Sequence, residues 1–288
     1  MKRAALVISI VAAAVITLFI LRSLYARALL ESFAGNLRQN GWGTAGDRYI
    51  MQPKEMVTFE ASYLFIKLGT VRFEILGRTE CNGVPSYRLR AFIDSYSGIP
   101  FVDYHAVYET CADARTMMCL STSNDKEKGD KWVRSKYILD YPVKRLIWEE
   151  SADGVLLKKV EMPIDTVYTD GLSFFYYVRE ACRASDGRKE KLAIPIVSDT
   201  IRSSVYLTIN ERREPCSVSA FHYPIQANRL SGHIDFEGTF GVTGAFVGWI
   251  SADSAAVPLK ADLKVIVGSI VVKLKSISRD RWIPPRAE

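Results

Sequence analysis

The sequence has 288 residues, 48% of them hydrophobic, and a formal net charge of +6 at pH 7. Four of its 38 basic residues and none of its 32 acidic residues lie within residues 1–28, so the rest of the chain is nearly neutral. Because no block of lysine and arginine follows, nothing in the sequence matches the phosphate backbone of a nucleic acid. We therefore expect no nucleic-acid partner, and the remaining length favours one large domain.

The N-terminal region contains an uncharged, mostly apolar run of 18 residues, residues 4–21, with basic residues on both sides. In a helix this run extends about 27 Å, close to the thickness of the hydrocarbon core of a bilayer. It is also longer than the apolar part of most cleaved signal peptides. We therefore expect residues 1–28 to be a signal anchor that crosses the bacterial inner membrane once and holds the domain in the periplasm. A cleaved signal peptide is the alternative, because Ala26 and Ala28 have the spacing of a cleavage site.

The next segment, residues 29–53, is expected to change from helix to connector. Apolar residues at helical spacing predict an amphipathic stalk, and they are Leu29, Leu30, Phe33 and Leu37. Three glycines within residues 41–46 then end the helix. The folded domain is expected over residues 54–278, followed by a C-terminal tail of residues 279–288.

From residue 54 onward the apolar period becomes two, which is typical of strands with one buried face. Val57, Phe59 and Ala61 alternate with polar residues, and a second run ends near Ile75, so this segment predicts a β-hairpin. Further strands, separated by turn residues, are expected at residues 86–93, 102–111, 117–122, 132–140, 145–149 and 155–162. Because no helix interrupts the series, an antiparallel sheet is favoured over β-α-β units.

Five cysteines in an oxidising compartment allow at most two disulfides. Cys111 and Cys119 flank residues 112–118, which resemble the bend of a hairpin, and facing residues on neighbouring strands approach within disulfide range. This spacing makes the two cysteines the candidate disulfide pair, with two buried free thiols as the alternative. The absence of a Cys-x-x-Cys motif argues against the usual redox and zinc sites.

One helix is predicted, over residues 171–184, with Thr169 or Asp170 as its N-cap. The stripe that should pack on the sheet consists of Leu172, Phe175, Tyr176, Arg179 and Cys182. Four consecutive aromatic residues on one helix cannot all face one sheet, so some should line a groove, a second layer or a partner. The candidate ligand-binding residues are therefore Phe174, Phe175, Tyr176 and Tyr177. A helix enclosed between two layers of the same domain is the alternative.

After the helix, strands are expected at residues 191–196, 200–211, 216–225, 233–239, 246–252 and 257–278. In the last of these strands the apolar residues change from odd-numbered to even-numbered positions at Gly268, which predicts a β-bulge. The predicted fold class is therefore mainly β. It is a large curved antiparallel sheet, arranged as a sandwich or an open barrel, with one packed helix and a preceding membrane helix.

Several short motifs accompany this pattern, namely FEASY at 59–63, IKLGT at 66–70, YET at 108–110, DGLSFFYYVR at 170–179, and a closing run from WISAD at 249–253 to GSI at 268–270. The helical motif and the closing run are the specific ones. With these motifs the chain resembles an exported bacterial family, domain of unknown function 3108. The resemblance implies an all-β envelope protein, and the family supplies no established activity or catalytic residues to transfer.

Catalytic motifs are scarce, since the sequence has no Walker loop, no Gly-x-Ser-x-Gly and no His-Glu-x-x-His. The best candidate for chemistry is the set His233, Asp235 and Glu237, which alternate along a predicted strand and should project from one face. An imidazole and two carboxylates can share a proton or bind a divalent cation. The alternative is a solvated strand face opposite Ile234 and Phe236. No catalytic residue is assigned and no cofactor is expected.

Three functions follow from these observations. The first is a non-catalytic envelope scaffold or carrier, whose concave apolar interior binds a lipid-like or otherwise apolar ligand near the membrane. The second is an interaction module that recruits another envelope protein through strand edges or its aromatic helix. The third, least supported, is a hydrolase of envelope glycans that uses carboxylates such as Asp235 and Glu237.

Overall fold

The computed structural model describes residues 50–99, 103–236, 242–265 and 268–287. The apolar run of residues 4–21, the expected stalk and Glu237 lie outside the described residues. Within the described ranges no helix combines the length and the apolar character that a membrane span requires.

Fourteen strands and one α-helix make up the described part of the chain. Before the helix lie β1 (Met56–Tyr63), β2 (Ile66–Cys81), β3 (Val84–Ser95), β4 (His105–Asp113), β5 (Cys119–Lys128), β6 (Lys131–Asp140), the short 3-10 helix η1 (Tyr141–Val143), β7 (Arg145–Ala152) and β8 (Val155–Pro163). After α2 (Gly171–Ala184) follow β9 (Glu190–Ser198), β10 (Ile201–Cys216), β11 (Ile225–Ile234), β12 (Val242–Ser251), β13 (Pro258–Val265) and β14 (Ser269–Ser278).

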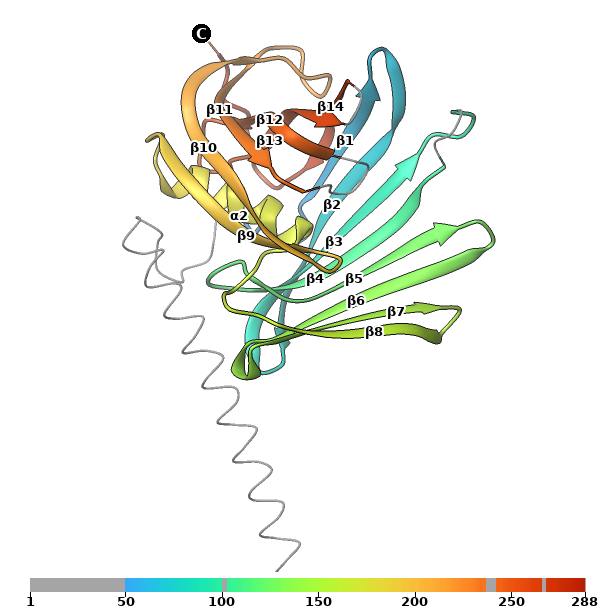
Figure 1. Cartoon of the computed structure of the whole chain (residues 1–288). Coiled ribbons are helices and arrows are strands. Elements are labelled where there is room, and N and C mark those ends of the chain that lie inside the picture. The colour runs from blue at the N-terminus through green and yellow to red at the C-terminus, as the bar shows by residue number, and fades with distance from the viewer. Residues whose placement is uncertain (1–49, 100–102, 237–241, 266–267, 288) are drawn as a thin grey trace, which may run out of the picture.

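All these strands belong to one sheet, in the order β8-β7-β6-β5-β4-β3-β2-β1-β14-β13-β12-β11-β10-β9. Every neighbouring pair is antiparallel. The predicted class, mainly β with a large antiparallel sheet and one helix, is therefore confirmed. The first strand lies beside the last in the middle of the sheet, while β8 and β9 form its two edges (Figure 1).

The sheet curls around α2. This helix contacts β3 and β4 from one half of the sheet and β9 and β10 from the other half, although the two pairs are far apart in the strand order. Because a flat sheet cannot reach both sides of one helix, the sheet forms a curved, open wall (Figure 1). The helix is thus enclosed between two portions of the same sheet.

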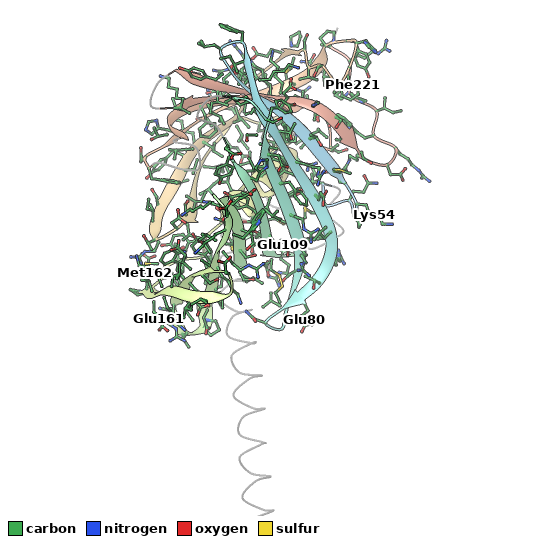
Figure 2. The ribbon with its side chains drawn as sticks, turned by 90° about the vertical axis from the view of Figure 1, so that its right-hand side faces the viewer. Lys54, Glu80, Glu109, Glu161, Met162 and Phe221 are labelled. Atoms are coloured by element: carbon green, nitrogen blue, oxygen red, sulfur yellow. A yellow bond between two sulfur atoms is a disulfide. The ribbon has the colours of Figure 1, made fainter. Side chains whose placement is uncertain are left out.

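Alternation along each strand decides which side chains face the helix. On β4, Thr110 is buried on the inner face, whereas Glu109 points outward and accepts hydrogen bonds from Arg88 and Arg90 at 2.8 and 2.7 Å. Figure 2 views the molecule from this outer side, with Glu109 and Glu161 labelled. The outer face of β3 to β8 therefore carries ion pairs in water, and the inner face carries the core.

The helix forms where the sequence predicts it. Asp170 is the N-cap, and its side chain accepts a hydrogen bond from the Ser173 backbone N–H at 3.0 Å. In return, the Ser173 hydroxyl oxygen accepts one from the Asp170 backbone N–H at 3.0 Å. This capping box satisfies two backbone donors that would otherwise lack partners. Tyr176 and Arg179, on the predicted stripe, are fully buried against the sheet.

Three strand predictions in the C-terminal half are wrong. The expected strand over residues 257–278 is a hairpin of β13 and β14, with Gly268 at a φ of +83° between them. A turn changes which of the alternating positions are apolar, and a β-bulge does the same. The sequence pattern therefore did not distinguish a turn from a bulge. The expected strands over residues 216–225 and 233–239 are replaced by a connection and by β11 (Ile225–Ile234). Val218 is buried in that connection, and with buried Cys216 at the end of β10 it gives the sequence a strand-like alternation.

The disulfide prediction is also wrong. Cys111 is bonded to Cys81 at the end of β2, with a Cα–Cα separation of 6.6 Å, and Cys119 is a buried free thiol. The physical reason is register: Cys119 lies opposite Ala112, and the register shifts between Cys111 and Ala112. Cys111 therefore lies opposite Ser121 on β5 rather than opposite Cys119, and its sulfur bonds to that of Cys81 on β2.

Candidate ligand-binding cavity

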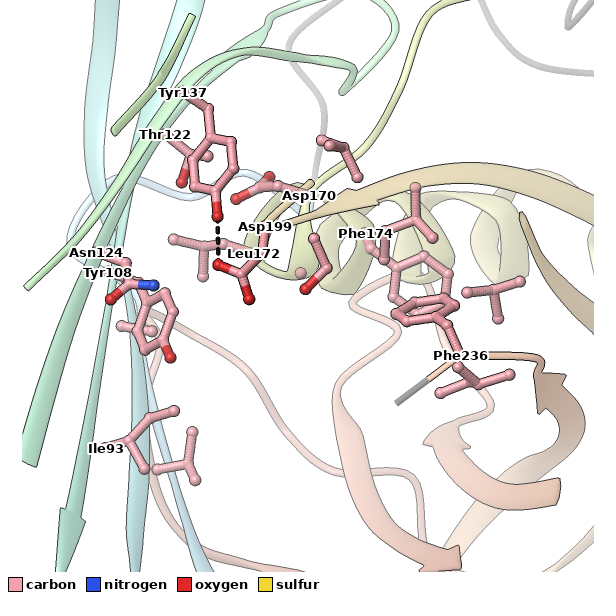
Figure 3. Close-up of a pocket in the computed structure, with 18 of the residues that line it drawn as sticks. Ile93, Tyr108, Thr122, Asn124, Tyr137, Asp170, Leu172, Phe174, Asp199 and Phe236 are labelled. Atoms are coloured by element: carbon pink, nitrogen blue, oxygen red, sulfur yellow. Dashed lines mark hydrogen bonds between the residues drawn. The ribbon is translucent and has the colours of Figure 1, made fainter. Parts of the chain in front are cut away.

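A cavity of about 300 Å³ lies between α2 and the curled sheet. Figure 3 shows it with the strands of the first half on one side and the helix on the other. Most of its lining is apolar, contributed by Val71, Phe73, Ala91, Ile93, Leu172, Phe174, Ile196, Val197, Val205, Ile234 and Phe236. Its polar lining consists of Tyr108, Thr122, Asn124, Lys126, Tyr137, Asp170, Ser198 and Asp199, and Gly171 completes it.

Strand register builds the polar side of the cavity. Ala91 on β3 lies opposite Tyr108 on β4, and Tyr108 lies opposite Asn124 on β5. One step along the strands, Thr122 lies opposite Tyr137 on β6. Since directly opposed residues of antiparallel strands point to the same face, these four polar side chains form one surface, which we call the polar wall: Tyr108, Thr122, Asn124 and Tyr137.

The side chains of the polar wall form hydrogen bonds that leave one of its polar atoms without a partner in the described part of the chain. The Tyr108 and Tyr104 hydroxyls are 2.9 Å apart, and Tyr137 donates to the Asp199 carboxylate at 2.6 Å. Asn124 is only 6% exposed, and its side-chain carbonyl oxygen has no hydrogen-bond partner among the described residues. A buried acceptor in this state is costly, and this oxygen is itself closed off from solvent, so the cavity does not reach it.

Tyr104 and Tyr137 remain protonated donors at neutral pH. Burial raises the pKa of the Tyr104 hydroxyl, and the neighbouring Tyr108 raises it further. Burial, together with the hydrogen bond to Asp199, raises the pKa of Tyr137 in the same way. Neither hydroxyl is placed to act as a general base near pH 7.

At the start of α2, Asp170 is held by bonds within the protein. Its carboxylate accepts from the Thr110 hydroxyl at 2.5 Å as well as from Ser173 in the capping box. The adjacent Cys119 thiol is fully buried, and burial followed by the Asp170 carboxylate raises its pKa well above the ordinary value. The thiol is therefore neutral and unreactive rather than a nucleophile.

Only one of the four predicted aromatic residues lines the cavity. Phe174 does so, facing Phe236 (Figure 3). Phe175 instead stacks on Phe73, with ring centroids 4.0 Å apart and an interplanar angle of 3°. The remaining pair, Tyr176 and Tyr177, is buried in the core, so the helix offers no exposed aromatic face to a partner protein.

The predicted acid–base set is not assembled at this cavity. His233 and Asp235 are 2.9 Å apart, and each side chain is 54% exposed on the outer surface. β11 ends at Ile234, so Asp235 already lies beyond the strand, and Glu237 lies outside the described residues. Ile234 and Phe236 point the other way and line the cavity. No group of three or more histidine, cysteine, aspartate or glutamate side chains in the described ranges is arranged to hold a metal ion.

Sequence reasoning missed a buried charged cluster, formed by Glu55, Arg179 and Arg279. Arg179 donates to the two Glu55 carboxylate oxygens at 2.5 and 3.2 Å and to the carbonyls of Ala255 and Ala256 at 3.1 and 3.0 Å. Arg279 also donates to Glu55. Burial by itself lowers the pKa of Arg179, but the Glu55 carboxylate outweighs it and raises the pKa. The one signal in the sequence was an arginine within the apolar stripe of the helix.

These features define a class of protein: a curled, open antiparallel sheet that wraps around one helix and encloses a partly apolar cavity. The family model described as "Protein of unknown function (DUF3108)" matches residues 58–275. The chain belongs to this family, as its motifs indicated. A comparison with curated proteins finds no match.

The solved structures similar to this chain include the following two. One is a β-barrel-like protein of domain of unknown function DUF1849 from Brucella abortus, with a TM-score of 0.50 and 10% sequence identity, covering 78% of this chain and 97% of that one. The other is described as a putative lipoprotein from Parabacteroides distasonis, with a TM-score of 0.32 and 8% identity, covering 79% of this chain and 96% of that one. At 10% identity the first similarity supports a shared fold and nothing about function. The second, with a TM-score of 0.32, supports no conclusion about this chain.

Proposed function

We propose that this protein is a non-catalytic component of the bacterial cell envelope that holds an apolar or lipid-like ligand in the cavity between α2 and the sheet. The observation that carries the proposal is the cavity itself, which is lined by side chains that are mostly apolar. The apolar run of residues 4–21 supports a membrane-anchored protein whose domain lies in the periplasm.

The size and lining of the cavity favour a small apolar occupant. Ligand pockets usually measure about 300 to 1,000 Å³ and combine an apolar lining with a few polar groups. At about 300 Å³ this cavity is at the lower limit, so a single alkyl chain fits better than a two-chain lipid. The protonated tyrosines and the neutral Cys119 thiol supply no nucleophile or base, which favours binding over catalysis.

Photo-crosslinking in membranes tests this proposal. The full chain, reconstituted in vesicles, is exposed to an alkyl probe that carries a diazirine in the middle of its chain, and labelled peptides are identified by mass spectrometry. We expect labelling at cavity residues such as Val71, Phe73 and Phe174. Labelling confined to exposed apolar residues, such as Phe65, which is 89% exposed, would contradict the proposal.

A cavity-filling variant provides the matched comparison. Ala91 lies on the cavity wall and is 4% exposed, so Ala91→Leu should occupy part of the cavity and reduce labelling there. Ala193 lies on the exposed face of β9, so Ala193→Leu adds the same atoms without entering the cavity and should leave labelling unchanged. A thermal unfolding curve of each variant establishes that both are folded. Equal labelling of the two variants would count against the cavity as the binding site.

A further inference from the structure

The turn between β1 and β2 carries large apolar side chains where comparable turns carry small or polar ones. Leu64 and Phe65 form this two-residue turn, and they are 73% and 89% exposed. The φ of Leu64 is +53°, a conformation that favours glycine, asparagine or aspartate. The turns after β2, β7 and β9 have such residues at positive φ, namely Asn82, Asp153 and Asp199. Leucine in this turn is therefore unfavourable for the backbone and places apolar surface in water.

The next two residues extend this apolar surface and end it with a positive charge. Ile66 is 45% exposed, and with Leu64 and Phe65 it forms what we call the apolar tip. The Lys67 side chain is 66% exposed, and residues 61–73 contain two basic residues and no acidic residue. Apolar side chains followed by a lysine suit the surface of a bilayer, where the apolar groups enter and the ammonium stays with the head groups.

The small size of the apolar tip favours a bilayer over a protein as its partner. A stable protein interface buries roughly 800 Å² on each partner, far more than three side chains at the end of a turn present. Insertion into a bilayer needs no complementary surface, and its strength increases with the apolar area that is buried. A weak insertion suffices when the protein is already tethered to the same bilayer, because the tether raises the local concentration.

The chain before the domain is long enough to provide that tether. β1 extends from Met56 to Tyr63, so the chain enters the sheet about 27 Å from the apolar tip, at the opposite end. Between the expected membrane span of residues 4–21 and Ile50 lie 28 residues, which reach at most about 95 Å when fully extended. This length allows the domain to turn the apolar tip toward the bilayer that holds its own N-terminal segment.

The cavity lies toward the same end of the sheet as the apolar tip. The turns after β1, β3 and β5 share this end because neighbouring strands are antiparallel (Figure 1). Cavity residues on these strands lie close to the turns: Val71 is five positions after Ile66, and Ile93 and Lys126 are each two positions before their strands end. Insertion of the apolar tip would therefore bring the cavity toward the lipid surface.

We propose that the apolar tip inserts into the bilayer that holds residues 4–21, and that the cavity exchanges its ligand with this bilayer. This inference rests on the proposed function and names the membrane surface as the partner of the same cavity. Leu64 and Phe65 lie among the acyl chains, and the Lys67 ammonium lies at the head groups.

Photo-reactive phospholipids test the insertion. The full chain is reconstituted in vesicles of phosphatidylcholine and phosphatidylglycerol that contain a small fraction of phospholipid with a diazirine in its acyl chain, and labelled peptides are identified by mass spectrometry. We expect labelling at residues 64–67. Val143 is the internal comparison, because it is 49% exposed and lies between β6 and β7, at the opposite end of the sheet.

Each other arrangement of the domain gives a different result. Labelling of Val143 in place of residues 64–67 would place the opposite end of the sheet at the bilayer and overturn the inference. An apolar tip that is covered by another protein molecule, or that remains in water, would show no labelling by the phospholipid, and this result would overturn it as well.

A matched pair of variants measures the contribution of one side chain. Phe65→Ser should lower phospholipid labelling of Leu64 and Ile66 about tenfold, because the transfer of one phenylalanine ring out of water changes an equilibrium by at least that factor. Val143→Ser also removes an exposed apolar side chain and should leave this labelling unchanged. Thermal unfolding establishes that both variants are folded. Equal labelling of the tip in the two variants would contradict the insertion.

The alkyl diazirine probe separates this inference from the proposed function. When it is supplied in the same vesicles for increasing times before illumination, Phe65→Ser should slow labelling of the cavity about tenfold and leave its final extent unchanged. An unchanged rate would overturn exchange with the bilayer through the tip and leave the proposed function standing. Phospholipid labelling of the tip without any alkyl labelling of the cavity would overturn the proposed function and leave the insertion standing.

Discussion

Two regions of this molecule bury polar side chains, and they differ in how those side chains are partnered. In the charged cluster, Arg179 and Glu55 are both fully buried, and the Arg179 guanidinium makes four hydrogen bonds to protein oxygens. In the polar wall, Asn124 is almost as buried, but its carbonyl oxygen lacks a partner among the described residues. The contrast teaches that burial of a polar group does not by itself indicate a binding site.

The charged cluster should give the largest loss of stability. Arg179→Met leaves the Glu55 carboxylate buried without its main partner, so the free energy of unfolding should fall by about 3 to 5 kcal/mol. Chemical denaturation measures this loss. Arg145→Met is the control, since Arg145 and its partner Glu161 are both more than 40% exposed and the pair should contribute about 0 to 1 kcal/mol. Equal losses in the two variants would refute the structural role of the cluster.

Substitutions at two neighbouring phenylalanines on α2 compare the effect of a core position with that of a cavity position. Phe175→Ala removes the ring stacked on Phe73 and should cost about 3 kcal/mol of unfolding free energy, the lower end for a phenylalanine because the ring is half-buried. Phe174→Ala, on the cavity side, should cost less and should weaken photo-labelling of the cavity instead. Denaturation and labelling of both variants check this. A larger loss of stability in Phe174→Ala, with weaker labelling in Phe175→Ala, would show that Phe174 does not line the cavity.

On the outer face, Glu109 should give a smaller, pH-dependent effect. Burial raises its pKa, but the hydrogen bonds from Arg88 and Arg90 outweigh burial and lower the pKa below 4.5. A lowered carboxyl pKa stabilises the folded state above the ordinary value, and that contribution is lost as the pH falls through the folded-state pKa. Glu109→Gln should therefore lose about 1 kcal/mol at pH 7, with the difference from wild type shrinking below pH 4.5. A pH-independent difference would contradict this origin.

The smallest expected effect is at His105, an exposed cross-strand residue. Its Nδ1 lies 3.0 Å from the Asp94 carboxylate, and this hydrogen bond raises the pKa of the imidazole above 6.5. The stabilisation is present below pH 6.5 and disappears as the pH rises through the raised pKa. An NMR titration should show the raised pKa in the wild type and a value closer to 6.5 in Asp94→Asn. An unchanged titration in that variant would exclude Asp94 as the cause.

Local patterns predicted the elements whose signals are short in range. The capped helix of residues 171–184 and the alternating strands before it depend on spacing within one segment, and the structure has both. The errors came where two arrangements share one pattern. Gly268 marks a change in which face carries the apolar residues, and a bulge or a turn produces that change equally. Cys111 had one candidate partner nearby in the sequence, Cys119, whereas its bonded partner, Cys81, lies on a strand that is not its neighbour.

The candidate site shows the same division. The sequence indicated that some of the aromatic residues of the helix would line a groove, a second layer or a partner, but not that Phe174 would line a cavity while Phe175 packs in the core. It contained no signal for Asn124, because an asparagine on a strand is ordinary until the opposite wall is known. Its register with Tyr108 depends on strand pairing, and the enclosure depends on β9 to β11.

The sequence by itself determined the class of fold, the helix of residues 171–184 and the family, because apolar period, capping residues and motifs are local properties of the chain. Only the tertiary structure decided that the sheet curls, that Arg179 reaches Glu55 across 124 positions, and which side chains surround the cavity. Those features depend on contacts between residues distant in sequence, and such contacts depend on how the whole sheet bends around the helix.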